Sequence, residues 1–231
     1  MEIELFNDVA QSDKYTQVLT IKVPPLLEPL LATSIDIVAG TAKEWTIGQA
    51  DWAPFKPRAV NPFVISIPAE VASYLTFDET EMKFTLTADR AIKDAAKSNP
   101  VIDVELFNEN ETTSKFSQTM KIQVPPILSA DIDQSVALVV GTAKEWILPA
   151  PDSSPYQMDT EAPIRVDIPA DIQSYLTFTA QSRTLSWSNN INAMHTVEGK
   201  TYTINIKLKN EQGTESSYNQ KLTFTVPVIP A

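Results

Sequence analysis

The hexapeptide Gly-Thr-Ala-Lys-Glu-Trp occupies residues Gly40–Trp45 and returns unchanged at Gly141–Trp146. The two copies start 101 residues apart. An identical block at a long, fixed separation is typical of an internal repeat, so other landmarks should keep the same separation.

Further blocks do keep it. They are Ile67–Glu70 with Ile168–Asp171, Ser73–Phe77 with Ser174–Phe178, Glu4–Asn7 with Glu105–Asn108, and Ile21–Pro25 with Ile122–Pro126. The repeating unit is therefore about 100 residues long, the size of a β-sandwich domain. We predict two such units, residues 27–126 (repeat 1) and 127–231 (repeat 2). Residues 1–26 match only the last hairpin of an incomplete preceding repeat.

Within each unit the apolar residues recur with period two, which indicates strands with one buried and one solvated face. The clearest runs are Phe63/Ile65/Ile67, Ile102/Val104/Leu106, Ile164/Val166/Ile168 and Ile204/Ile206/Leu208. Helical spacing is weak except for one short turn at 89–97. The sequence therefore predicts an all-β protein with about seven strands per repeat in two packed sheets.

The prolines and glycines indicate how the units are joined. Only five glycines are present, and proline pairs follow the last strand of a unit at Pro24-Pro25 and Pro125-Pro126. Proline ends a strand ladder and stiffens the chain that leaves it. We expect a semi-rigid string of repeats.

Composition narrows the classes of partner. The 231 residues carry a net charge of −11 and no cysteine, with 43% hydrophobic and 20% charged residues. An acidic surface repels nucleic acid and anionic lipid, and cysteine-free chains form no disulfides or thiolate metal sites. The N-terminal residues lack the pattern of a signal peptide, and the most apolar stretch, Val23–Gly40, holds charges and prolines that prevent it from crossing a bilayer.

The order of these blocks resembles the dystroglycan-type cadherin-like repeat. Each unit has an apolar strand, Gly-Thr-x-x-x-Trp, a strand ending in Ile-Pro-Ala, then Tyr-Leu-Thr-Phe and a last hairpin around Asn-Glu. The resemblance implies tandem immunoglobulin/cadherin-like β-sandwich repeats of an extracellular or cell-surface protein. The family's tryptophan is replaced by Tyr74 and Tyr175, and the spaced acidic motifs of calcium-binding cadherins are missing, so calcium-dependent rigidity is not carried over.

Catalysis is not expected. His195 is the sole histidine, lies in the polar stretch 189–199 and has no counterpart in repeat 1. A nucleophilic triad needs a base with an orienting partner, whereas a solitary histidine of this kind fits an exposed loop. We therefore predict no enzyme activity, no catalytic residues and no cofactor-binding residues.

The tryptophans divide into two groups. Trp45 and Trp146 occupy matched positions beside apolar strands, which favours burial as core anchors over sugar binding. Trp52 lies in a proline-rich loop with Phe55, and Tyr156 is the later equivalent of Phe55. These three residues are the predicted partner contact if the loop binds a glycan or a protein; the alternative is that they only cover the core.

Two acidic clusters, Asp78–Glu81 and Asp131–Asp133, offer oxygen ligands to calcium, although solvated charge is the interpretation that we adopt. Asn110 begins the glycosylation sequon Asn-Glu-Thr at a predicted hairpin tip. No metal site is predicted.

These observations predict a structural or adhesive spacer of a longer extracellular or cell-surface protein, acting through protein–protein contacts. The alternative is a carbohydrate- or protein-binding module that uses the Trp52 loop. The predicted partners are neighbouring repeats, another copy of the chain, or a cell-surface protein or glycan. A lone hairpin is marginal in water, so we expect residues 1–26 either to dock on Leu26–Leu31 or, preferentially, to pair with another copy.

Overall fold

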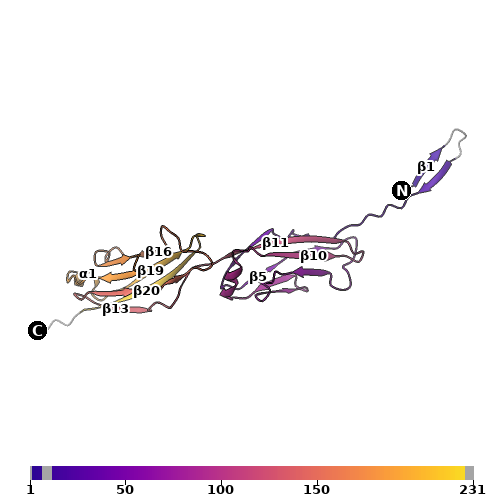
Figure 1. The fold of residues 1–231 in the computed structure, drawn as a ribbon. Helices are drawn as coiled ribbons and strands as arrows, with labels where there is room; N and C mark the ends of the chain where they lie inside the picture. The colour runs from indigo at the N-terminus through magenta and orange to yellow at the C-terminus, as the bar shows by residue number, and fades with distance from the viewer. Residues whose placement is uncertain (1, 7–11, 227–231) are drawn as a thin grey trace. The chain divides into compact units, whose positions relative to one another are not determined.

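The computed structural model describes residues 2–6 and 12–226, which are nearly all in strands and their connecting turns (Figure 1). Ahead of repeat 1, β1 (Glu2–Phe6) pairs antiparallel with β2 (Ser12–Thr16). The strands of repeat 1 are β3 (Leu26–Glu28), β4 (Ser34–Val38), β5 (Lys43–Thr46), β6 (Gln49–Asp51), β7 (Phe63–Ser66), β8 (Leu75–Asp78), β9 (Lys83–Leu86), β10 (Val101–Phe107) and β11 (Thr113–Gln123). The strands of repeat 2 are β12 (Ile127–Leu128), β13 (Ser135–Val139), β14 (Lys144–Ile147), β15 (Pro151–Asp152), β16 (Ile164–Asp167), β17 (Leu176–Thr179), β18 (Thr184–Trp187), β19 (Thr201–Lys209) and β20 (Glu215–Thr225).

The two repeats have the same sheet topology. Repeat 1 contains a four-stranded sheet of order β4-β11-β10-β7 and a three-stranded sheet of order β5-β9-β8. Repeat 2 contains the equivalent orders β13-β20-β19-β16, seen side by side in Figure 1, and β14-β18-β17. A short pair accompanies each set, β3 with β6 and β12 with β15. The all-β prediction is confirmed, and the two larger sheets of each repeat hold the predicted seven strands, to which the short pair adds two. Each repeat is an immunoglobulin-like β-sandwich.

Division of the chain into compact units gives two, each made of three separate segments, unlike the continuous repeats predicted from the sequence. One unit comprises Met1–Ile35, Lys43–Leu86 and Val101–Met120, and the other comprises Asp36–Ala42, Thr87–Pro100 and Lys121–Ala231. The boundary between Pro126 and Ile127 therefore stays a prediction from the sequence repeat.

The repeated hexapeptide forms a turn and the strand that follows it. Gly40 and Gly141 have φ values of +88° and +79°, a region that side chains disfavour. The amide of Thr41 donates to the carbonyl of Val38 at 3.0 Å, and that of Thr142 to Val139 at 3.1 Å. Glycine at the third position of such a turn is the signature of type II geometry. The residues after the turn form β5 and β14, which carry Trp45 and Trp146.

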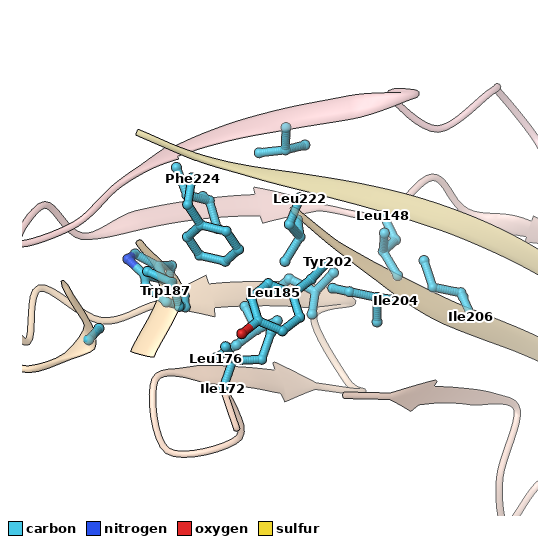
Figure 2. Packing of buried hydrophobic residues seen from close by; sticks show 14 of the residues in the cluster. Leu148, Ile172, Leu176, Leu185, Trp187, Tyr202, Ile204, Ile206, Leu222 and Phe224 are labelled. Carbon is cyan, nitrogen blue, oxygen red and sulfur yellow. The ribbon is translucent and has the colours of Figure 1, made fainter. Parts of the chain in front are cut away.

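Period-two burial holds along the long strands. On β10 every second side chain is buried, including Ile102, Val104 and Leu106, and on β19 the same is true of Ile204, Ile206 and Leu208. Figure 2 shows the core of repeat 2, where Trp187 and Phe224 lie beside Leu185 and Tyr202. The ring centroids of Trp187 and Phe224 are 4.9 Å apart. Alternation places one face of each strand in this core and the other in water.

The helical elements are short. The predicted turn at 89–97 is the 3-10 helix η1 (Arg90–Ala95), which begins where the Asp89 carboxylate accepts a hydrogen bond from the Ala91 amide at 2.8 Å. In repeat 2, α1 (Ala193–Val197) contains His195. The prediction of a loop at this position is wrong, because 193–197 complete one helical turn; the His195 side chain lies outside the described part of the chain.

Candidate functional site

The predicted core tryptophans lie at equivalent positions but are only partly buried. Trp45 faces Phe84 across β5 and β9, and Trp146 faces Leu185 across β14 and β18. Each lies on the edge strand of its three-stranded sheet. Both indoles contact core residues at equivalent positions, as predicted, but each is partly rather than wholly buried. The tryptophan that is fully buried is Trp187, with 1% of its surface exposed, at the position of Leu86 in repeat 1.

The two edge tryptophans differ in their polar contacts. The Trp45 indole stacks on Phe84 at 5.1 Å, and its Nε1 donates to Gln118 Oε1 at 2.9 Å. The indole nitrogen of Trp146 is buried without a hydrogen-bond partner among the described residues. A groove of about 350 Å³ runs beside Trp45 and is lined mainly by apolar residues such as Leu31 and Ile35. Its counterpart beside Trp146 is about 110 Å³.

Two buried glutamines hold the chain just before the first strand of each four-stranded sheet. Gln118 Nε2 donates to the carbonyl of Ala32 at 2.9 Å, and Gln220 Nε2 donates to the carbonyl of Asp133 at 2.7 Å. Ala32 and Asp133 are equivalent positions, 101 residues apart. Both glutamines are at most 2% exposed. A buried amide needs such partners, so these bonds fix the path of the chain into β4 and β13.

A second pair of buried amides, Asn108 and Asn210, closes the last hairpin of each repeat. Asn108 Oδ1 accepts from the amides of Asn110 and Thr112 at 3.0 and 3.1 Å, and Asn210 Oδ1 accepts from the Thr214 amide at 2.9 Å. Both side chains are fully buried. The asparagine oxygen thus satisfies turn amides that would otherwise lack an acceptor.

The other end of each asparagine binds the segment that leads into its repeat. Asn108 Nδ2 donates to the carbonyl of Val23 at 2.8 Å, two residues before Pro25. Asn210 Nδ2 donates to the carbonyl of Val124 at 2.7 Å, two residues before Pro126. We call this arrangement the asparagine clasp. It joins the lead-in segment, at the proline pair, to the closing hairpin.

The sequence analysis did not assign a role to the clasp asparagines or the buried glutamines. The signal was present, because Asn7, Asn108 and Asn210 end the same block and Gln17, Gln118 and Gln220 recur at matched positions. A polar residue that recurs at an inward position of a period-two strand indicates a buried hydrogen bond, since an unpaired amide there would be costly.

The Trp52 loop packs onto repeat 1. Trp52 is partly buried and meets the ring of Phe63 edge-on, with centroids 5.6 Å apart, and Phe63 belongs to the core at 7% exposure. The loop turns where the Phe55 amide donates to the Trp52 carbonyl at 2.8 Å. Covering the core is thus one role that the structure gives to Trp52, and whether the loop binds a partner stays a prediction.

The equivalent loop of repeat 2 lacks the tryptophan. The Tyr156 amide donates to the Ser153 carbonyl at 3.0 Å, which repeats the turn of Phe55 and Trp52. Ser153 is buried and its hydroxyl donates to the Tyr156 carbonyl at 2.9 Å. The Tyr156 hydroxyl accepts from Gln212 Nε2 at 3.1 Å. The three predicted contact residues therefore belong to two separate loops, one in each repeat.

The first acidic cluster, Asp78–Glu81, makes contacts within the chain, and the second, Asp131–Asp133, is exposed at both aspartates. Asp78 Oδ1 accepts from the amides of Thr80 and Glu81 at 2.8 and 3.0 Å, and Glu81 pairs with Lys83 at 2.6 Å. The pKa of Lys83 is raised, chiefly by its hydrogen bond to Glu81. Among the described residues no group of three His, Cys, Asp or Glu side chains could hold a metal ion, and the prediction that these clusters are solvated charge stays untested.

One ionisable pair is confined to repeat 2. The Tyr202 hydroxyl donates a hydrogen bond to Asp171 Oδ2, and Lys200 lies 3.5 Å from the same carboxylate. Burial, together with this bond, raises the pKa of Tyr202 to about 12. The bond from Tyr202 also lowers the pKa of Asp171. Pro100 occupies the position of Tyr202 in repeat 1, so the pair has no counterpart there.

The sequon residue Asn110 is exposed in the turn between β10 and β11, as predicted, and its glycosylation stays a prediction. No helix of the described chain is long and apolar enough to span a membrane.

No protein-family model and no curated protein matches this chain. Solved structures with a similar fold are tandem immunoglobulin-domain proteins. An I-band fragment of titin is 14% identical, with 90% of this chain and 68% of that chain covered and a TM-score of 0.40. Extracellular domains 3 to 5 of Drosophila OTK are 9% identical, with 95% of this chain and 68% of that chain covered and a TM-score of 0.45. The insect immune protein hemolin is 10% identical, with 95% of this chain and 54% of that chain covered and a TM-score of 0.46. At these identities and scores the similarity indicates no partner or activity, and the resemblance to the dystroglycan-type cadherin-like repeat stays a prediction.

Proposed function

We propose that this chain is a structural or adhesive spacer of a longer extracellular or cell-surface protein, of the dystroglycan-type cadherin-like class, and that it acts through protein–protein contacts rather than catalysis. The observation that carries the proposal is the asparagine clasp. In both repeats a fully buried asparagine binds the carbonyl two residues before the second proline of the lead-in pair.

The clasp supports a spacer for a physical reason. A chain that transmits force or holds a distance must not lose length at the segments between its folded units. Proline at 125 and 126 restricts the backbone of the segment between β11 and β12, and Asn210 holds the carbonyl of Val124 just before them. The Tyr218 hydroxyl adds a bond to the Pro126 carbonyl at 3.2 Å. Three adjacent residues of the lead-in are therefore restrained by a ring or a hydrogen bond.

A mutation at the clasp tests the proposal. In Asn210→Ala the amide of Thr214 and the carbonyl of Val124 lose their side-chain partner, so we expect the segment around Pro125 to become mobile while both sandwiches stay folded. Small-angle scattering should show a wider distribution of maximum dimensions for Asn210→Ala than for the unmodified chain. Asn219→Ala is the matched control, because Asn219 is exposed on β20, and it should leave the profile unchanged. Identical profiles for the unmodified chain and Asn210→Ala, in a variant shown to be folded, would remove the support for a stiff spacer.

A further inference from the structure

The hairpin formed by β1 and β2 has the same register as the closing hairpin of repeat 1. Its pairs run from Glu2↔Thr16 to Phe6↔Ser12. Shifted by 101 residues, these become Asp103↔Ser117 to Phe107↔Thr113, which are the observed pairs of β10 and β11. Because a slip of one residue would reverse every side chain, an identical register assigns the hairpin to the same place in a sandwich.

The residues that follow β2 form no strand, whereas their counterparts in both complete repeats do. β11 continues to Gln123, and the equivalent stretch of repeat 2, Lys221–Thr225, pairs in parallel with β13. By contrast β2 ends at Thr16, and residues 17–22 belong to no strand. Each complete repeat supplies a strand beside this stretch, β4 in repeat 1 and β13 in repeat 2.

The same stretch exposes the side chains that a complete repeat buries. Leu19 is 71% exposed and Ile21 is 68% exposed. Their counterparts Met120 and Ile122 are 0% and 2% exposed. Two inward positions on the same strand face are thus left in water, although burying aliphatic side chains stabilises a fold.

We propose that β1, β2 and residues 17–23 bind the first seven strands of a repeat of this same sequence type, those equivalent to β3–β9, and thereby complete a third sandwich. This rests on the proposed function, since a tandem array is what supplies such a repeat. The proposed complex has three contact surfaces. A strand like β4 pairs with residues 18–22, a strand like β7 pairs with β1, and a sheet like β5-β9-β8 covers Leu19 and Ile21.

A second copy of the chain is a poorer occupant, although the sequence analysis favoured it. Both of its own repeats already contain their closing hairpins, β10 with β11 and β19 with β20, so its spare element is another two-stranded hairpin. Two such hairpins could pair along one edge. That pairing would supply no second flanking strand and no three-stranded sheet over Leu19 and Ile21, whereas a repeat remainder supplies both.

A hybrid chain tests the proposal directly. Residues 26–101 are placed ahead of Met1, so that Val101 of the added segment precedes Met1 as it precedes Ile102 in repeat 1. Amide hydrogen exchange at residues 17–22 is then compared between the hybrid and the unmodified chain. We expect exchange in the hybrid to slow by about 100-fold or more, because amides of a cooperatively folded sheet exchange only through its opening.

Paired variants identify the surface. Ile21→Asp in the hybrid should abolish the protection, because it places a carboxylate at an inward position. Lys22→Asp should retain it, because the counterparts of Lys22, Gln123 and Thr225, are exposed. Unchanged exchange at 17–22 in the hybrid, or protection that survives Ile21→Asp, overturns the proposal. Protection in the unmodified chain that rises with its concentration also overturns it, in favour of a second copy. None of these outcomes depends on Asn210, so the spacer proposal stands or falls separately.

Discussion

The two repeats have the same topology but place their aromatic side chains differently. In repeat 1 the aromatic contacts run through Trp45, Phe84, Phe77 and Phe63 to Trp52 in the loop. In repeat 2 they run from Tyr175 through Trp187 and Phe224 to Tyr202. The buried amides, by contrast, are the same in both. The difference indicates that large core side chains can change places between two repeats of one fold, whereas a buried amide must stay where its partners are.

Truncation of the most buried aromatic side chain tests the core half of this comparison. Trp187→Ala should cost about 3–5 kcal/mol in the free energy of unfolding of repeat 2, because a fully buried indole leaves a large cavity. Trp146→Ala should cost less, because Trp146 lies on an edge strand and is only partly buried. Denaturant unfolding followed by signals from each repeat measures both. Equal losses would mean that edge and core positions do not differ in energy.

Substitutions at the clasp test the second part of the comparison, that the buried asparagines are the same in both repeats because each is needed for stability. Asn108→Ala and Asn210→Ala should each cost about 2–3 kcal/mol in their own repeat, because buried hydrogen-bonding groups lose their partners. The exposed Asn219→Ala should change stability by less than about 0.5 kcal/mol. Thermal unfolding of the three variants is the measurement. A clasp variant as stable as Asn219→Ala would show that the repeated asparagine has no energetic role.

The edge tryptophans offer a finer comparison, because only Trp45 has a hydrogen-bond partner. Trp45→Phe should destabilise repeat 1 by about 1 kcal/mol through the bond lost from Gln118, in addition to any loss of packing. Trp146→Phe lacks that contribution, since its indole nitrogen has no partner among the described residues. The difference in unfolding free energy between Trp45→Phe and Trp146→Phe, measured by chemical unfolding, should narrow by about that amount in a Gln118→Leu background if the bond contributes to it.

The smallest expected difference between the repeats is in how their unfolding free energy depends on alkaline pH. The pKa of Tyr202 is raised to about 12, so the unfolded tyrosine, with an ordinary pKa near 10.0, loses its proton first. The stability that this raised pKa gives is present below pH 10 and is lost as pH rises towards about 12. Asp171, whose pKa is lowered, contributes above the ordinary aspartate range and loses its contribution as pH falls through the lowered value. Tyr202→Phe should flatten the alkaline loss in repeat 2, and unfolding that is unaffected by this substitution would contradict the assignment.

The sequence predicted the fold well because its signals are local. The hexapeptide predicted the internal repeat, and the structure adds that Gly40 and Gly141 adopt the positive φ that explains why glycine is repeated. Period-two runs predicted β7, β10, β16 and β19. What it missed depends on tertiary placement. Burial of Trp45 and Trp146 is limited by their edge strands, which a single chain pattern does not reveal, and the short helix at His195 has weak helical spacing.

The candidate site was less predictable, because hydrogen bonds across long separations decide it. The clasp joins Asn210 to Val124 and Asn108 to Val23, which are remote in sequence. Repetition alone marked these residues, and only the structure shows the carbonyls that they bind.

The central proposal is a stiff spacer, in which the clasp restrains the lead-in segment. Residual dipolar couplings of the backbone amides in repeats 1 and 2 test it most directly. The account predicts that couplings from both repeats fit one alignment tensor, with or without calcium, and that Asn210→Ala, but not Asn219→Ala, needs two. Two tensors of different magnitude in the unmodified chain would show that the repeats tumble independently and would contradict the account.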